Sequence, residues 1–183
     1  NPWNQAEKIS SKEEVKRMMT ENPQRLLTAL EAIAKSEANH AKLALQKGAS
    51  GIFLAIANAD PTVMTLAQYR KFSEPFDRMV LAAASSAPLN VMHIHGDKVY
   101  LDLFLSGWPQ AVINYSASDT KVALAATRKK FPGVLMGGID EDAWGRAGVR
   151  QEAMIAHVVV VHRQVDPCIR HAILYVSWID RAA

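Results

Sequence analysis

Four short apolar segments alternate with helical segments along this chain, and that alternation restricts its fold more than any other feature. The apolar segments occupy residues 51–57, 89–96, 110–116 and 133–139. The first, GIFLAIA, is apolar at consecutive positions, as expected of a strand covered on both faces of a parallel sheet. Strands that alternate with helices are typical of parallel α/β proteins with right-handed crossovers. The sequence therefore predicts an α/β fold with about four to five parallel strands.

Capping signals and apolar spacing predict the helices that precede the second strand. Ser11 and Glu14 have the spacing of a capping box, so a short helix is expected to begin there. A long helix is expected over residues 22–48, where apolar side chains recur at helical spacing and a glycine ends the pattern. A third helix begins at Thr65, and Pro75 must end, kink or restart it.

The later part of the chain contains two further helical segments and then a weaker pattern. Residues 97–107 are interpreted as a helix, and so are residues 120–131, with Asp119 as the capping residue. Beyond the fourth strand the alternation degrades, so residues 142–183 are treated as a tail that departs from the pattern. Because no linker or internal repeat interrupts the chain, we expect residues 1–183 to form a single domain.

Composition limits the class of protein further. The chain of 183 residues is 49% hydrophobic and 21% charged, which is enough for one globular core. No apolar run approaches the roughly 18 residues of a membrane helix, and the first residues lack the apolar region of a secretory signal. The single cysteine, Cys168, excludes an internal disulfide and fits a reducing compartment. The net charge of +3 is dispersed, apart from the cluster Arg128-Lys129-Lys130. A cytoplasmic protein with neither nucleic acid nor membrane as partner is therefore expected.

Polar and titratable residues follow each of the predicted strands. In parallel α/β architectures, ligands bind at the carboxyl ends of the strands, where the loops open. The residues at these ends are Asn58 and Asp60, then His93, His95 and Asp97, then Asn114, Tyr115, Ser116 and Asp119, and finally Gly137, Gly138 and Asp140. Their collection at one edge indicates a small-molecule site, although helix capping would equally explain Asp119 and Asp140.

The stretch VMHIHGD places two histidines two residues apart at the end of a strand. Side chains at this spacing share a face, so His93 and His95 are expected to project together. Two imidazoles can bind zinc, but a catalytic zinc site needs a third protein ligand, for which Cys168, Asp140 and Asp97 are the candidates. Alternatively, the histidines bind substrate or act as acid and base without a metal, or one of them hydrogen-bonds a buried carbonyl. Spacing alone leaves these interpretations open.

Several common catalytic motifs are absent from the sequence. It contains no glycine-rich phosphate loop, G-x-S-x-G elbow, C-x-x-C pair or H-E-x-x-H helix. Their absence argues against nucleotide hydrolases, serine hydrolases and zincin proteases.

The stretches GASGIFLAIANAD, TLAQYRKFSEPFDRMVL and NVMHIHGDKVYLDLFLSGWPQAVINYSASDTKVALAATRKKFPGVLMGGIDE resemble the C-terminal half of the uroporphyrinogen decarboxylase superfamily. This superfamily also contains cobalamin-linked, zinc-dependent methyltransferases. The resemblance covers about residues 1–141 and is strongest over 48–141. It implies a (β/α)₈ barrel of TIM type, of which this chain would supply about half. Because so few strands cannot close a barrel, the resemblance implies completion by an N-terminal half or by a second copy in a homo-oligomer.

The resemblance implies decarboxylation of tetrapyrrole acetate side chains in porphyrin biosynthesis, a reaction that needs no cofactor. The substrate is then a small molecule held at the carboxyl ends of the strands. The implied site residues are His95 and Asp140 for catalysis, and Asn58, His93, Asn114 and Asp119 for substrate binding.

Two alternatives remain open beside the decarboxylase. In the first, His93, His95 and Cys168 hold zinc, and a substrate thiol accepts a methyl group from a corrinoid partner. In the second, the chain is an incomplete barrel half that acts as a non-catalytic module. The sequence also departs from the family, because the decarboxylases carry a serine where this chain has Ala57 or Asn58. The methyltransferases carry His-x-Cys in place of its His-x-His.

Overall fold

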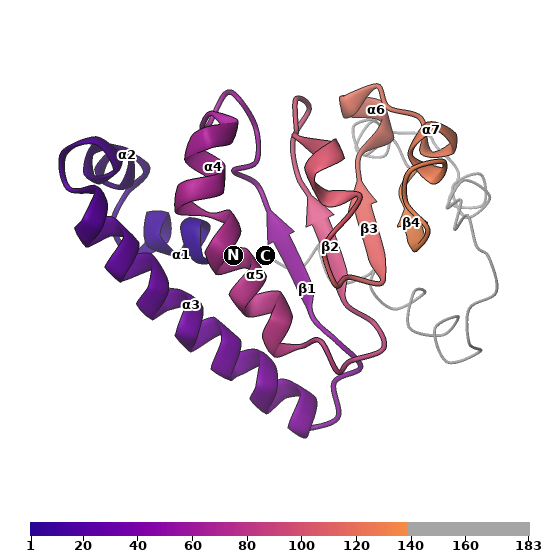
Figure 1. Ribbon diagram of the computed structural model, residues 1–183, viewed down its shortest axis with the longest axis horizontal. Helices are drawn as coiled ribbons and strands as arrows, with labels where there is room; N and C mark the ends of the chain where they lie inside the picture. The colour runs from indigo at the N-terminus through magenta and orange to yellow at the C-terminus, as the bar shows by residue number, and fades with distance from the viewer. Residues whose placement is uncertain (139–183) are drawn as a thin grey trace, which may run out of the picture.

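A computed structural model describes residues 1–138 of the chain, which form helices packed against one parallel sheet (Figure 1). The strands are β1 (Phe53–Ile56), β2 (Val91–Ile94), β3 (Val112–Tyr115) and β4 (Val134–Met136). They pair in the order β1-β2-β3-β4, and each neighbouring pair is parallel. Within the described residues the sheet does not close. The predicted α/β fold is therefore confirmed, and it is consistent with part of a TIM barrel.

Helices connect these strands and precede them. In Figure 1 the helices α3, α4 and α5 lie on the β1 side of the molecule. The helical elements are α1 (Pro2–Ile9), α2 (Lys12–Glu21), α3 (Pro23–Gln46), α4 (Leu66–Phe72), α5 (Glu74–Ala83), the 3₁₀ turn η1 (Leu101–Phe104), α6 (Ala117–Thr120) and α7 (Leu124–Arg128). No helix in this described part of the chain is long and apolar enough to span a membrane.

The helix starts predicted at Ser11 and Thr65 agree with the structure, and the structure decides among the alternatives at Pro75. The Ser11 hydroxyl accepts a hydrogen bond from the Glu14 amide at 3.1 Å, and α2 begins directly after it. Thr65 and Gln68 form a reciprocal capping box at the start of α4, which satisfies two amides that the helix leaves unpaired. Pro75 lies in the first turn of α5, where its missing N–H costs no helical bond, so it restarts the helix rather than only ending it.

The helix predicted over residues 97–107 is wrong. Only the 3₁₀ turn η1 forms there. The Tyr100 amide donates to the Ala59 carbonyl at 2.9 Å, and the Tyr100 hydroxyl donates to the Met64 carbonyl at 3.0 Å. Because these bonds tie the start of the segment to the loop after β1, too few residues remain for an α-helix.

The predicted capping role of Asp119 is also wrong. Ser116 caps α6, and its hydroxyl accepts a hydrogen bond from the Asp119 amide at 3.2 Å. Asp119 therefore lies within the first turn of α6 rather than ahead of the helix. The chain then turns at Lys121, whose φ of 58° is left-handed, before α7 begins. Both Ser116 and Asp119 are favourable capping residues, and the earlier one takes the role.

The two faces of the sheet have different environments. Side chains such as Leu54, Met92 and Ile113 join the helices in the main core. The opposite face carries a smaller apolar cluster of Leu89, Val91, Val112 and Val134. At its edge Phe53 is 48% exposed, so the described residues do not cover β1 on both faces as GIFLAIA predicted. The second face would form the inside of a barrel.

Candidate functional site at the carboxyl ends of β2 and β3

The two histidines of the H-x-H-G stretch lie next to each other at the end of β2. The centroids of the His93 and His95 rings are 5.6 Å apart, and the ring planes are inclined by 43°. His93 is half-buried and His95 is exposed. Both project from the face of the sheet opposite the main core, because residues two apart on a strand share a face.

Asn114 joins this pair from the neighbouring strand. In the parallel register of β2 and β3, His93 lies opposite Asn114. The Asn114 side-chain oxygen is hydrogen-bonded to Nδ1 of His93, and the amide nitrogen donates to the Met136 carbonyl of β4 at 2.9 Å. On the other side, the Phe53 ring stacks on His93 with centroids 5.5 Å apart. Side chains from β1 and β3 therefore contact the His93 imidazole, and the Met136 carbonyl of β4 bonds the Asn114 amide.

Asp60 connects the loops that follow β1 and β2. Its carboxylate accepts hydrogen bonds from the Thr62 amide at 2.8 Å and from the Lys98 amide at 3.2 Å. Burial alone would raise the pKa of Asp60, but these hydrogen bonds outweigh burial and lower the pKa below its ordinary value. The ionised carboxylate thus fixes the loop that carries His95 against the loop after β1.

Gly96 makes the turn between His95 and this connection. Its φ of 129° lies in a region that other residues rarely adopt. A Cβ at this position would lie 3.0 Å from a carboxylate oxygen of Asp60 and 3.1 Å from Cγ1 of Val99. The glycine in H-x-H-G therefore serves both the backbone turn and the close approach of Asp60.

The hydrogen bonds of the Asn58 side chain are made to residues other than the two histidines. It is 1% exposed, and its amide nitrogen donates to the Ser73 hydroxyl at 2.8 Å. Its side-chain oxygen accepts from the Asn1 side chain at 2.9 Å. The structure thus places this predicted substrate-binding residue beside the junction of α4 and α5, whereas His93, His95 and Asn114 come together.

Sequence reasoning missed a buried carboxyl group at the same junction. Asp77 is fully buried, and its carboxyl accepts hydrogen bonds from the Tyr69 and Ser73 hydroxyls, both at 2.9 Å. Burial raises its pKa to about 6, while hydrogen bonds from its neighbours oppose that rise. The signal in the sequence is the spacing of four residues from Tyr69 to Ser73 and from Ser73 to Asp77, which aligns the three side chains.

The remaining predicted site residues do not join the histidine pair in the described part of the chain. Asp119 is exposed on α6, and Asp97 is exposed in the loop after β2. Asp140 and Cys168 lie outside the described residues. Among residues 1–138, no group of three histidine, cysteine, aspartate or glutamate side chains is arranged to hold a metal ion. A zinc site that included the two histidines would therefore need a third protein ligand, which residues 1–138 do not bring to them.

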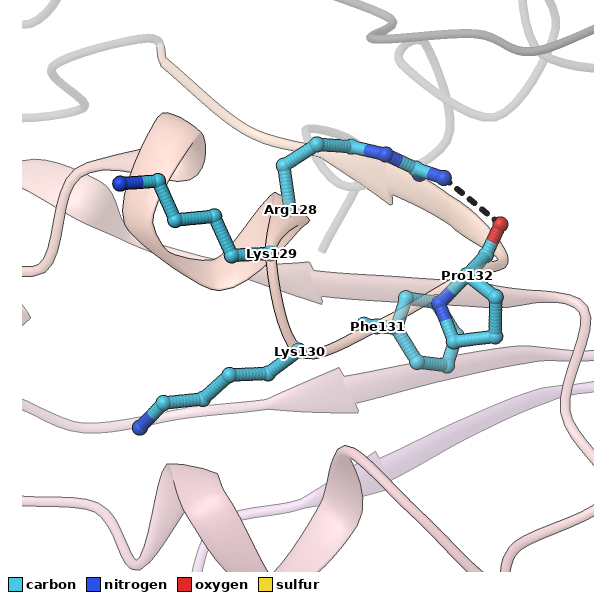
Figure 2. A pocket seen from close by; sticks show the side chains of 5 residues that line it. All are labelled: Arg128, Lys129, Lys130, Phe131 and Pro132. Carbon is cyan, nitrogen blue, oxygen red and sulfur yellow. Dashed lines mark hydrogen bonds between the residues drawn. The ribbon is translucent and has the colours of Figure 1, made fainter.

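Two hollows in the described structure lie away from the histidine pair. One of about 510 Å³ precedes β4 and is lined by Arg128, Lys129, Lys130, Phe131 and Pro132 (Figure 2). Figure 2 shows the Arg128 side chain folded toward the Pro132 carbonyl, to which it donates at 2.8 Å. Lys130 is paired with Asp102, also at 2.8 Å. Another hollow, of about 430 Å³, lies between α3 and α5. Neither of these two hollows is lined by His93 or His95, so both are separate from the candidate site.

The parallel sheet, its intervening helices and the polar groups gathered at one strand edge define an α/β protein built like part of a TIM barrel. Residues 2–164 match the family model described as uroporphyrinogen decarboxylase (URO-D), and the chain belongs to this family. The resemblance seen in the sequence is thus confirmed. The match continues past residue 141 into the segment that departs from the strand pattern. No curated protein and no solved structure matches the chain.

Proposed function

We propose that the chain takes part in decarboxylating the acetate side chains of a tetrapyrrole, at the edge where β2 and β3 end. The observation that carries this proposal is the meeting of His93, His95 and Asn114 on one sheet face in a member of the URO-D family. The carboxyl ends of parallel strands are where such folds bind small molecules. The substrate proposed is accordingly a uroporphyrinogen.

The decarboxylation requires few catalytic side chains. The bond between the side-chain methylene and its carboxylate breaks, carbon dioxide leaves, and the methylene carbon takes a proton. The exposed imidazole of His95 is suited to supply that proton, and the Asp140 carboxylate is suited to accept hydrogen bonds from the pyrrole nitrogens. His93 and Asn114 would hold the substrate edge. No step in this scheme requires a cofactor.

The test is product analysis after anaerobic incubation of the chain with uroporphyrinogen. The products are oxidised to porphyrins and separated by their number of carboxylates, and we expect species with fewer carboxylates to accumulate. His95→Ala should lower the rate by about 10²-fold or more, as loss of a general acid does. His40→Ala is the matched control, because His40 is exposed on α3. Absence of decarboxylated products would contradict the proposal.

The 5.6 Å separation of the two imidazoles favours a second candidate, a zinc-dependent thiol methyltransferase. His93 and His95 would hold the metal, with Cys168 as the proposed third ligand. Bound zinc would lower the pKa of a substrate thiol. Stoichiometric zinc that is lost in His93→Ala and in His95→Ala would support this candidate, whereas a folded chain purified without zinc and unable to take it up would eliminate it.

A further inference from the structure

We propose that Asp60 is a positioning residue for His95, because its carboxylate holds the backbone that follows His95 at the carboxyl end of β2. The proposal deepens the proposed function and rests on it for its purpose, since it concerns the imidazole assigned there as the acid. Asp60 is only 4% exposed. It therefore acts on the site through the loop that it binds rather than by touching substrate.

Asp60 is itself fixed by the turn that follows β1. Its main-chain carbonyl accepts hydrogen bonds from the Val63 and Met64 amides at 2.9 and 3.0 Å. One carboxylate oxygen, Oδ1, accepts from the Thr62 amide at 2.8 Å and from the Thr62 hydroxyl at 2.6 Å. Because these bonds hold both the backbone and the side chain, the carboxylate has a defined place on the β1 side of the connection.

The other carboxylate oxygen, Oδ2, faces the loop after β2. It accepts a hydrogen bond from the Lys98 amide at 3.2 Å, and a Cβ on Gly96 would lie 3.0 Å from it. Within the sheet, the His95 amide donates to the Ile56 carbonyl at 2.9 Å. The sheet therefore fixes the backbone at His95, and Asp60 fixes it again three residues later.

The two carboxylate oxygens differ in their number of donors, which decides how an amide would sit in their place. Both oxygens of a carboxylate accept, so Asp60 serves Thr62 and Lys98 together. In Asp60→Asn the single oxygen keeps two bonds by facing Thr62 and one by facing Lys98, so we expect it to face Thr62. The amide nitrogen then opposes the Lys98 N–H. This variant therefore breaks the contact with the His95 loop and leaves the turn after β1 in place.

A second connection between the same loops supplies the matched control. The Tyr100 hydroxyl donates to the Met64 carbonyl at 3.0 Å, five residues after His95. Tyr100→Phe removes this bond, but it leaves the carboxylate of Asp60 and the bond from the Tyr100 amide to the Ala59 carbonyl intact. A purely structural role of the connection predicts that both variants act alike. Positioning predicts that only Asp60→Asn moves His95.

The first experiment is NMR of the histidine rings in the ¹⁵N-labelled wild type and both variants, with His95 assigned by its loss in His95→Ala. Spectra are recorded where circular dichroism shows each protein to be folded. We expect the His95 ring signals to move in Asp60→Asn and to keep their wild-type positions in Tyr100→Phe, while His40 on α3 is unmoved in both. His95 signals that are unchanged in folded Asp60→Asn, or that move equally in both variants, would overturn the proposal.

The second experiment is steady-state decarboxylation of uroporphyrinogen by the same proteins. Because Asp60 orients the acid without touching substrate, kcat should fall about 10-fold or more in Asp60→Asn while KM stays within about 2-fold. Tyr100→Phe should retain the wild-type kcat. A loss confined to KM, or equal losses of kcat in both variants, would contradict positioning. The NMR readout needs no turnover, so His95 signals that respond as expected in a chain without activity would contradict the proposed function alone.

Hydrogen exchange of the wild type decides the matter should Asp60→Asn fail to fold. Lys98 is exposed, so its bond to Asp60 is the contact that should protect its amide from exchange with solvent. We expect this amide to exchange more slowly than an unprotected peptide amide. Exchange at the unprotected rate would show that the bond does not form and would overturn the proposal.

Discussion

Replacing the buried carboxyl of Asp77 with an amide should change how the stability of the chain depends on pH. The pKa of Asp77 rises from 3.8 to about 6 in the folded chain, chiefly through burial. One pKa unit corresponds to about 1.4 kcal/mol, so the ionised carboxyl should cost about 3 kcal/mol of unfolding free energy. In Asp77→Asn this pH-dependent cost is absent. The Tyr69 and Ser73 hydroxyls can accept as well as donate, so they can pair with the amide.

The sign follows from proton binding in the two states. Below pH 3.8, Asp77 is protonated in both the folded and the unfolded chain and contributes no pH dependence. Between 3.8 and about 6, the unfolded chain releases the proton while the folded chain keeps it, so stability falls as pH rises. Above that range both states are ionised, and the cost is constant.

The assay is urea unfolding of wild type and Asp77→Asn at a series of pH values from about 3.5 to about 8. Taking the difference between the two proteins at each pH cancels the contributions of all other groups. Relative to the variant, the wild type should lose about 3 kcal/mol across the series. The reasoning about this carboxyl would be refuted if the difference in unfolding free energy between the two proteins did not change with pH. It would also be refuted if the wild type became more stable relative to the variant as pH rises.

Two further predictions concern the connection between the loops after β1 and β2. Gly96→Ala should destabilise the chain by about 1–3 kcal/mol in thermal or urea unfolding, because its φ of 129° is strained for alanine and the Cβ approaches Asp60; unchanged stability would contradict this geometry. Asp60→Asn should cost about 1–3 kcal/mol at neutral pH, since an amide cannot accept from both Thr62 and Lys98. Because the pKa of Asp60 is lowered, its stabilisation is present above 3.8 and is lost as pH falls through the folded-state value, so the two proteins should converge in acid. A difference that grows in acid would show that the carboxylate is not the stabilising group.

Local signals in the sequence predicted much of the fold. The four apolar runs contain the four strands, and the capping residues Ser11 and Thr65 begin helices where expected. Such signals act over a few neighbouring residues, so they can be recognised without the tertiary structure. The helix predicted over 97–107 failed because Tyr100 bonds to a loop that is distant in sequence.

The candidate site was predictable in location but not in its contacts. The period of two along a strand was enough to place His93 and His95 on one face. The pairing of His93 with Asn114 depends on the register between β2 and β3, which the sequence of either strand does not fix. The inward hydrogen bonds of Asn58 similarly depend on how α4 and α5 pack over β1.

The central claim is that a tetrapyrrole binds where β2 and β3 end. The most direct measurement is a titration of the ¹⁵N-labelled chain with uroporphyrinogen under anaerobic conditions. The titration is followed by NMR through the ring signals of individual histidines. We predict that the signals of His93 and His95 shift together and saturate, while the signal of His40 on α3 stays in place. Binding that leaves His93 and His95 unshifted, or no binding at all, would contradict the claim.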